Sequence, residues 1–302
     1  MPAVRAPEPD LAEALRLRMG DTVKVTEPGV YDMPAEDYHR DPVEGGSLSS
    51  TGARKLLEMA PARWRYEQAH PTTPTAPMIL GTAVHSLTLG VGAQVVVIDA
   101  DDWRTKKAKD AKAEALAAGN VPLLRDDYDQ ASAMAKAVLD HPVAGKLFSY
   151  ERGKPEQALV WFDAEFGIWR RSMVDHLPHA GSDWPILVDL KTTASASPRA
   201  LSKTIAQYGY HQQAAFYLDG YEALFPGSGP DFLFVFVESA PPYLVSVVGL
   251  DRHALHVGAE LNRRAMEIYR DCTAVDIWPG HSTEIEYVSL PGWASRRIEE
   301  PV

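Results

Sequence analysis

The chain has 302 residues, 45% of which are hydrophobic, and it contains a single cysteine. That length supports one large domain or two small ones with a substantial core, and one cysteine excludes both a disulfide framework and a cysteine-rich zinc or iron–sulfur site. The formal net charge of -11 argues against a general nucleic-acid coat protein, because such proteins bind by neutralising phosphates.

Residues 1–46 are predicted to form an extended N-terminal arm. They contain several prolines, scattered charges and a closing Gly45-Gly46, and at most a short helix is expected at residues 11–17. No run approaches the roughly 18 apolar residues of a membrane span, and the N-terminal segment, which contains Asp and Glu, is unlike a signal peptide. We therefore expect a cytoplasmic protein without a membrane segment.

A helix is predicted to begin after Ser47 and to end before Pro61, with Ser49 and Thr51 at its start. Hydroxyl groups at this position usually cap the helix by accepting hydrogen bonds from free backbone N–H groups. The same N–H groups and the helix dipole attract anions, and Arg54 lies one turn further on to add charge-assisted hydrogen bonds. Both uses can coexist, so Ser49, Thr51 and Arg54 are candidates for a phosphate site.

An apolar helix is expected from residue 78 to residue 89, and it carries His85. From the pattern alone, a single histidine on an apolar helix is more often a hydrogen-bonded core residue than a ligand. A short strand at residues 95–100 precedes a lysine-rich segment at 101–118, which is predicted to be a solvated helix, with a basic flap over DNA as the alternative. Another helix is expected at residues 126–139.

Three consecutive antiparallel strands should follow, at residues 157–162, 167–174 and 186–190. Asp175 closes the second strand, while Asp189 and Lys191 lie two residues apart on the third and therefore point to the same face of the sheet. Glu156 stands at the edge of the first strand, either as a further acidic ligand or as an ordinary strand-end charge. We favour the strand-end interpretation slightly.

Charged side chains on a strand as apolar as residues 186–188 need a compensating partner. Two carboxylates repel each other unless a hard cation such as Mg²⁺ or Mn²⁺ binds their oxygens, and a lysine beside that ion can orient water or stabilise charge on a phosphate. This is the chemistry of phosphodiester hydrolysis. The spacing alone is weak evidence, because Asp110-Ala111-Lys112 has it within a predicted helix, and a solvated strand end with a salt bridge is the alternative.

The second half of the chain predicts a helix at residues 205–224, strands at 231–238 and 243–250, and a helix at 254–268. Tyr210, Gln213 and Tyr217 fall on one face of the first of these helices, where the amide needs either a core network or a contact with the DNA backbone. The order of elements predicts an α/β fold with a central mixed sheet of about five strands flanked by helices. The domain should span residues 47–278, followed by an irregular C-terminal tail at 279–302.

Four motifs occur in the order seen in a known group of nucleases: Gly81-Thr-Ala-Val-His85, Arg171-Ser-Met-Val-Asp175, Asp189-Leu-Lys-Thr-Thr193 and Gln213-Ala-Ala-Phe-Tyr217. The pattern of Asp175 followed by Asp189-Leu190-Lys191 resembles the signature of the PD-(D/E)XK superfamily, and the four motifs together resemble its RecB-like nucleases. The closest resemblance, over roughly residues 30–270, is to the exodeoxyribonuclease VIII (RecE-type) exonucleases of phages and prophages, which are relatives of lambda exonuclease.

The resemblance implies a role for each matching residue. Catalysis would involve Asp175, Asp189, Lys191, Gln213 and Tyr217. The metal would be held by His85, Asp175, Asp189 and the backbone carbonyl of Leu190. The candidates for binding DNA or its 5′-phosphate are the three residues of the phosphate site inferred above and one arginine of the second motif: Ser49, Thr51, Arg54 and Arg171. Further basic groups for the DNA path, which would offset the acidic net charge locally, are Arg170, Arg199 and Lys203.

The resemblance further implies a Mg²⁺-dependent 5′-to-3′ exodeoxyribonuclease that degrades the ends of double-stranded DNA and leaves 3′ single strands for recombination. One or two Mg²⁺ ions, replaceable by Mn²⁺, belong to this expectation. So do a closed homo-oligomeric ring, either a trimer or a tetramer, and a single-strand-annealing recombinase as partner. Two alternatives stay open: a structure-selective or restriction-type endonuclease on the same fold, and a DNA-binding protein without catalysis.

Overall fold

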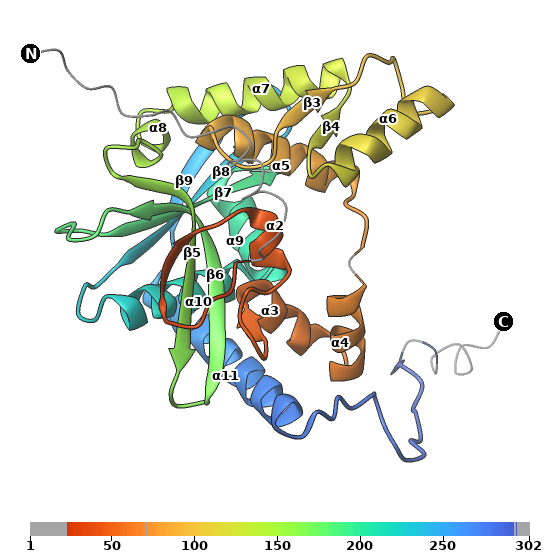
Figure 1. Ribbon diagram of the computed structural model, residues 1–302, viewed down its shortest axis with the longest axis vertical. Helices are drawn as coiled ribbons and strands as arrows, with labels where there is room; N and C mark the ends of the chain where they lie inside the picture. The colour runs from red at the N-terminus through yellow and green to blue at the C-terminus, as the bar shows by residue number, and fades with distance from the viewer. Residues whose placement is uncertain (1–22, 71, 293, 295–302) are drawn as a thin grey trace, which may run out of the picture.

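The computed structural model describes residues 23–70, 72–292 and 294, and these form a mixed β-sheet covered by helices (Figure 1). The strands are β1 (Gly29–Asp32), β2 (Ser47–Ser49), β3 (Val95–Val97), β4 (Val121–Leu123), β5 (Gly153–Asp163), β6 (Ile168–Pro178), β7 (Ile186–Thr193), β8 (Asp231–Glu238) and β9 (Val245–Gly249). The helices are α2 (Ala35–His39), α3 (Ser50–Glu58), α4 (Pro61–Ala69), α5 (Ala76–Leu89), α6 (Lys106–Ala117), α7 (Arg125–Asp140), α8 (Ala144–Leu147), α9 (Pro198–Gln207), α10 (Tyr210–Leu224) and α11 (Arg252–Val275). Among these helices, none has the length and apolar character that crossing a membrane requires.

The main sheet confirms the predicted mixed topology. Its strands lie in the order β1-β5-β6-β7-β8-β9, with β2 paired to β6. The pairs β7–β8 and β2–β6 are parallel, whereas the other neighbours are antiparallel. The five strands expected from the sequence for this sheet all belong to it. β1 comes from the predicted arm and β2 from the predicted start of the first helix, which makes seven strands in the described part of the chain.

Alternating side chains of the central strands build the two layers of the core. Phe234 of β8 packs with α3, α10 and α11, whereas the next residue, Val235, packs with α5 and α7 on the opposite face. A strand that is apolar on both faces is expected at the centre of a sheet covered on both sides. On β7 the same alternation puts Leu187 in the α10 layer, so Asp189 and Lys191 point to that side as well.

The segment from residue 23 to residue 46 is folded, which corrects the prediction of an extended arm for this part of the chain. β1 pairs with β5, and Val25, Met33 and Tyr38 are buried against Ala158 of that strand. Burial of these apolar side chains stabilises the docked segment, because apolar surface is removed from water. The short helix expected at residues 11–17 lies outside the described residues.

The predicted helix at residues 205–224 is two helices, α9 and α10, separated at Gly209. Gly209 adopts a left-handed backbone conformation with a φ of 65°, which ends α9 and lets α10 start in a new direction. A Cβ at this position would also lie 2.9 Å from Cδ of Arg54. The break places Tyr208 and Tyr210 at the corner between the two helices.

The sequence did not predict α2, α4 or α8, whereas the remaining helices agree with it. The lysine-rich segment forms α6, which projects from the body of the molecule beside β4 (Figure 1).

α4 begins at Pro61, a residue suited to the first turn of a helix. Trp64 of α4 stacks on Trp278 with ring centroids 5.1 Å apart, which fixes the chain after α11. From residue 277 to residue 290 the chain forms neither helix nor strand, in line with the irregular tail expected there.

Arg170 of β6 is buried, which removes it from the DNA path where the sequence analysis placed it. Its guanidinium pairs with Asp163 and Asp219 and lies over the rings of Trp161 and Phe216. A buried cation is tolerated when it is paired, and losing one partner is costly. Arg170 therefore joins the β5–β6 hairpin to α10.

Two glycine-to-alanine substitutions should change stability in opposite directions. At Gly258 of α11 a Cβ would lie 2.2 Å from the backbone oxygen of His211, so Gly258→Ala should overpack the α10–α11 contact and lower the free energy of unfolding by about 1–3 kcal/mol. At Gly81 of α5 the nearest atom, Oγ1 of Thr192, would be 3.6 Å away, so Gly81→Ala should raise it by up to about 1 kcal/mol. Urea unfolding measures both values, and a stable Gly258→Ala variant would contradict the close approach of the two helices.

Candidate active site

Three acidic side chains lie in a row across β5, β6 and β7. Asp175 precedes His176, which pairs with Val188 of β7, and Asp189 follows Val188. Glu156 lies between Pro155 and Gln157, which pair with His176 and Val174 on either side of Asp175. The strand pattern in the sequence predicts that only Asp175 and Asp189 converge, so Glu156 is an addition from the structure.

His85 of α5 bridges two of the carboxylates, and the metal-ligand role that the motif resemblance implied for it stays a prediction. Its Nδ1 lies 3.3 Å from Oε1 of Glu156, and its Nε2 lies 3.0 Å from Oδ1 of Asp175. Glu156 has a left-handed backbone conformation with a φ of 47°, which is strained for a residue with a side chain and is common at functional sites. Glu156 is therefore part of the acidic cluster, and the strand-end interpretation is not supported.

Asp189 is almost fully buried, and its two oxygens have different partners. Oδ1 accepts a hydrogen bond of 2.5 Å from Nε2 of Gln213, and Oδ2 pairs with the ammonium of Lys191. Oε1 of Gln213 in turn accepts a hydrogen bond of 3.4 Å from Nη1 of Arg54. Gln213 is thus a positioning residue that fixes the orientation of the Asp189 carboxylate.

The strands β6 and β7 separate beside this cluster. The backbone N–H of Leu190 donates a hydrogen bond of 2.7 Å to Oδ2 of Asp175, so this N–H binds a side chain instead of a neighbouring strand. Between β6 and β7, which both lie in the described part of the chain, His176 and Val188 are the one pair of residues in register. Glu156 and Asp175 line the hollow described below, whereas Asp189 stays buried behind them.

Burial and the neighbouring charges set the pKa values of the cluster. Burial raises the pKa of Asp189 to about 6, with Lys191 opposing the rise and Asp175 adding to it. Burial would also raise the pKa of Asp175, but the charges of His85 and Lys191 hold that pKa below its usual value. Despite burial, Asp175 and Glu156 raise the pKa of His85 to about 10, and Asp189 and Asp175 raise the pKa of Lys191. Two cations thus compensate the three carboxylates.

The donor set fits a hard divalent cation, because Mg²⁺ and Mn²⁺ prefer carboxylate oxygens. Oδ2 of Asp189 is buried and, apart from its ion pair, accepts no hydrogen bond, so it has a free lone pair. Within the described ranges, no group of three or more His, Cys, Asp or Glu side chains stands arranged as a metal site. Asp175 and Asp189 are the candidate ligands, with Glu156 and His85 beside them. Ligation by the Leu190 carbonyl stays a prediction.

An open hollow of about 570 Å³ lies over these groups, within the size range of ligand sites. His85, Asp175 and Lys191 line it together with Tyr217 of α10. Burial raises the pKa of Tyr217 well above its usual value, so its phenol stays neutral. Tyr210 was noted in the sequence only as part of a helix face, but its ring lies 5.3 Å from the Lys191 ammonium and holds that charge over its π face.

The predicted phosphate site is partly assembled. Ser49 caps α3, because its Oγ accepts a hydrogen bond of 3.0 Å from the backbone N–H of Gly52. Thr51 is exposed and lines the hollow, and Nη2 of Arg54 donates a hydrogen bond of 3.2 Å to its Oγ1. The groups left for an anion are therefore the exposed Thr51 and the half-buried Arg54, while Ser49 serves the helix.

Arg171 has a structural role where the sequence analysis expected a DNA contact. Its buried guanidinium donates hydrogen bonds to the carbonyls of Tyr38 and Ser47 and pairs with Asp41. These contacts hold the segment before β2 against β6, so we leave Arg171 out of the DNA-binding surface. Arg199 and Lys203 of α9 are exposed, as a DNA path would need.

Comparisons with known proteins identify a family and a shared fold. A family model described as a PDDEXK-like domain of unknown function (DUF3799) matches residues 50–291. The crystal structure of a “Putative exonuclease” from Eubacterium rectale covers 86% of this chain and 97% of that chain, with a TM-score of 0.60 and 12% identity, which shows a shared fold. The structure of SSO0001 covers 78% of this chain and 88% of that chain at 13% identity, but its TM-score of 0.34 is too low to show a shared fold. Among curated proteins, none matches the chain.

The buried carboxylate of Asp189 should be required for ion binding. Asp189→Ala should abolish the heat of Mn²⁺ binding in isothermal titration calorimetry, because it removes a carboxylate ligand. Lys191→Ala should keep this heat, because an ammonium group has no lone pair to offer a metal. Undiminished Mn²⁺ binding by Asp189→Ala would exclude this carboxylate as a ligand.

The same titration decides whether Glu156 is a ligand. If its carboxylate reaches the ion, Glu156→Gln should weaken Mn²⁺ binding by at least about tenfold, the size of effect that loss of a supporting group at a metal site produces. Glu151→Gln changes an exposed glutamate on the preceding turn and is the matched control. Equal affinities for the two variants would leave Glu156 as a partner of His85 alone.

Proposed function

We propose that this chain, which belongs to the family of PDDEXK-like domains of unknown function (DUF3799), is a nuclease that hydrolyses phosphodiester bonds of DNA with a divalent metal ion. The observation that carries the proposal is the row of Glu156, Asp175 and Asp189 beside Lys191, at the edge of an open hollow. The family match confirms the PD-(D/E)XK superfamily predicted from the four motifs. A RecE-type identity remains part of the proposal.

Each group of the chain has a distinct task in this reaction. When bound at Asp175 and Asp189, Mg²⁺ supplies a Lewis acid for the phosphate and a lowered pKa for the attacking water. Lys191 carries a positive charge, since its pKa is raised despite burial, and this charge can hold the water and stabilise negative charge developing on the phosphate. Gln213 keeps Asp189 in position through the hydrogen bond to Oδ1. We expect Mn²⁺ to replace Mg²⁺, because the two metals prefer the same oxygen ligands. One or two ions are expected to bind at each site.

The finer proposal is a 5′-to-3′ exodeoxyribonuclease that acts on double-stranded ends and leaves 3′ single strands for recombination. Its support is the resemblance of the four motifs to RecE-type exonucleases, together with the name of the solved structure that shares the fold. A structure-selective or restriction-type endonuclease would use the same acidic row. Dependence on a DNA end separates the two activities.

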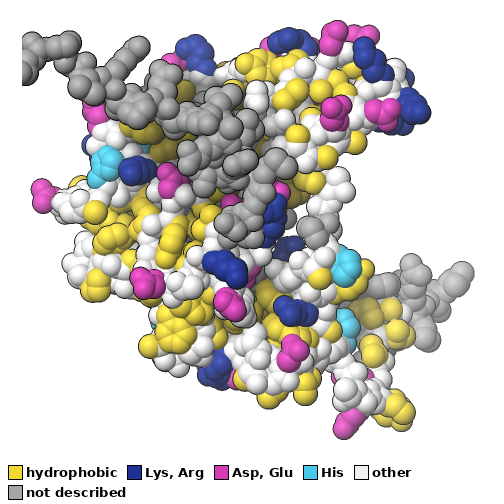
Figure 2. All heavy atoms as spheres, viewed as in Figure 1, with side chains coloured by type: hydrophobic (Ala, Val, Ile, Leu, Met, Phe, Trp, Pro, Cys, Tyr) yellow, Lys and Arg dark blue, Asp and Glu magenta, His cyan; other side chains and the backbone are white. Residues whose placement is uncertain are grey.

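The acidic net charge of the chain has to be reconciled with a DNA substrate. In the view of Figure 2, basic and acidic side chains are interspersed, with Lys and Arg gathered at the outer end of α6. We propose a closed homo-oligomeric ring, a trimer or tetramer, because a ring retains DNA by enclosing it and does not need high affinity. Light scattering that finds a monomer at working concentration would overturn the ring. A single-strand-annealing recombinase as partner and a cytoplasmic location belong to the same proposal.

A time course on linear and on covalently closed circular DNA, with Mg²⁺ or with EDTA, tests the activity. Linear duplex should be degraded only with Mg²⁺, and closed circles should persist. Lys191→Ala should lower kcat by about 10²–10⁴-fold, because it removes a charge used in the transition state. Cleavage of closed circles would establish an endonuclease, and no cleavage of either DNA would defeat the nuclease proposal. Full activity of Lys191→Ala would remove the lysine from the mechanism.

The pair of Thr51 and Arg54 predicts a preference for 5′-phosphate ends, since a terminal phosphate carries more charge than an internal one. Linear duplex with a 5′-phosphate should be degraded faster than duplex with a 5′-hydroxyl, and Thr51→Ala combined with Arg54→Gln should narrow the rate ratio. Ser49→Ala is the control, because it loses a helix cap worth about 1 kcal/mol but should keep the ratio. Equal wild-type rates on the two ends would rule out the phosphate site and weaken the proposed polarity.

A further inference from the structure

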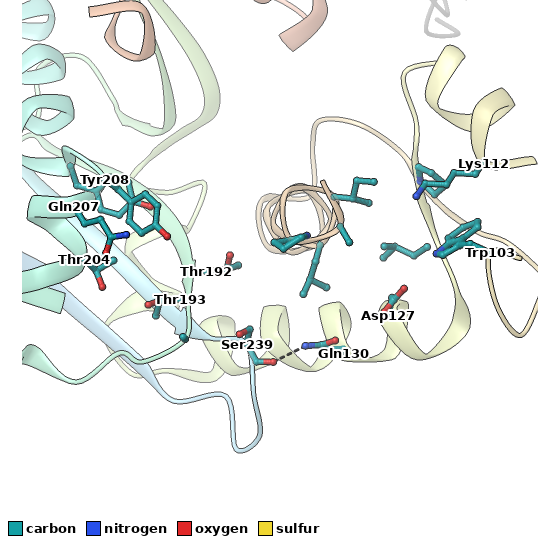
Figure 3. A pocket seen from close by; sticks show the side chains of 18 residues that line it. Trp103, Lys112, Asp127, Gln130, Thr192, Thr193, Thr204, Gln207, Tyr208 and Ser239 are labelled. Carbon is teal, nitrogen blue, oxygen red and sulfur yellow. Dashed lines mark hydrogen bonds between the residues drawn. The ribbon is translucent and has the colours of Figure 1, made fainter. Parts of the chain in front are cut away.

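A second hollow opens next to the candidate active site, and the proposed hydrolysis does not use it. It has a volume of about 640 Å³ and extends from the corner between α9 and α10, past the start of α5, to Trp103 and Lys112 (Figure 3). Thr192, Tyr208 and Tyr210 line both this hollow and the one over the acidic row, so the two hollows adjoin at these side chains. Nucleotides next to a phosphate bound at the acidic row would therefore lie near the second hollow.

Aromatic rings stand at both ends of this second hollow. At the near end, Tyr208 stacks on Tyr210 with ring centroids 5.8 Å apart, and 57% of the Tyr208 surface is exposed. At the far end, the ring of Trp103 lies 4.8 Å from the ammonium of Lys112. Figure 3 shows Tyr208 on one side of α5, and Trp103 with Lys112 on the other. Of the two, the Tyr208 ring is exposed and the Trp103 ring is half-buried. Aromatic rings along a groove are the groups on which nucleic-acid bases stack, whatever their sequence.

The lining between the rings offers neutral hydrogen-bonding groups and few charges. Thr192, Thr204 and Gln207 contribute hydroxyl and amide groups, while Lys112 and Asp127 contribute one charge of each sign. Such groups can bind sugars and phosphates without a strongly basic surface. Stacking is therefore the main source of affinity that this hollow provides, which suits a chain with a net charge of -11.

The size of the hollow favours a single strand over a duplex. Its volume of about 640 Å³ lies within the range of about 300–1,000 Å³ that holds small organic ligands, so it accommodates one or two nucleotides. A base within a duplex is stacked and paired and cannot stack on a protein ring until it is unpaired. Rings at the two ends consequently select nucleotides that have already left the duplex.

We propose that this hollow, called the strand groove and defined by Trp103, Lys112, Tyr208 and Tyr210, binds unpaired nucleotides of one DNA strand next to the scissile phosphate. Tyr208 and Trp103 stack bases, and Lys112 contacts a phosphate. Tyr210 joins the groove to the active site, because its ring also holds the Lys191 ammonium. This inference rests on the proposed nuclease function and adds to it a site for single-stranded DNA.

Binding without cleavage tests the strand groove independently of catalysis. In EDTA, the affinity of full-length protein for a fluorescent 12-nucleotide dT oligomer, measured by anisotropy, should fall by about 5- to 100-fold in Trp103→Ala and in Tyr208→Ala, the effect of losing one base stack. Tyr66→Ala removes another exposed tyrosine, which lies outside both hollows, and should bind as the wild type does. Circular dichroism checks that each variant is folded.

Two further readouts separate stacking from a purely structural effect. The fluorescence of 2-aminopurine placed in the oligomer should be quenched by wild type, by Tyr208→Phe and by Trp103→Phe, but not by the alanine variants, since only an aromatic ring can stack. Lys112→Gln should reduce the slope of log affinity against log salt concentration by about 0.7, as expected for one phosphate contact to a single strand.

The outcomes distinguish this inference from the proposed function. Wild-type binding and quenching that survive in both alanine variants would overturn the strand groove even if the enzyme cleaves DNA. Wild-type protein that binds the dT oligomer no better than the matching duplex would overturn it as well. Loss of binding in the alanine variants, with recovery in the phenylalanine variants, supports the groove even if the Mg²⁺ time course shows no cleavage and the nuclease proposal fails.

Discussion

The burial of the Asp189 carboxylate on a central strand is the constraint on which the site depends. A buried charge is costly unless it is paired and hydrogen-bonded, and here Lys191 supplies the opposite charge while Gln213 supplies the hydrogen bond. Gln213 can reach the carboxylate only because α10 lies close to β7. That position follows from the turn at Gly209 and from the close contact that Gly258 permits between α10 and α11. Packing far from the cluster therefore sets the geometry of its most buried member.

The row of carboxylates also explains why the sheet is distorted at this point. Three negative charges on adjacent strands repel one another, and the structure offsets this with His85, Lys191 and the N–H of Leu190, which binds Asp175. The left-handed backbone of Glu156 is a local strain of the kind that stable surroundings can maintain. A site that holds its carboxylates together in this way is prepared for a divalent cation, since the ion replaces repulsion by ligation.

Helix α5 connects the two hollows of the molecule. It carries His85 to the acidic row, and its first turns form a wall of the strand groove. Tyr208 and Tyr210, at the corner between α9 and α10, also line both hollows. Substrate contacts in both hollows thus depend on the docking of α5 against β7 and on the break between α9 and α10. The proposed cleavage and the proposed strand binding share these supports but use different side chains.

The sequence by itself determined the elements whose signals are local. A period of two places Asp189 and Lys191 on one face of a strand, hydroxyl residues at a helix start indicate a cap there, and the order of elements predicts the mixed sheet. The ordered motifs also identified the superfamily, because several short patterns in one order are far more specific than any one of them.

Only the tertiary structure decided which charged groups are buried and which distant residues meet. Arg170 and Arg171 look like surface cations in the sequence, yet long-range partners bury both. Glu156 joins the cluster through a strand register that a single sequence does not specify, and the turn at Gly209 depends on the packing around it. Trp103 and Tyr208 line one groove although about a hundred residues separate them. Local patterns record the face of an element, whereas pairing across the fold is set by the cooperative packing of the whole core.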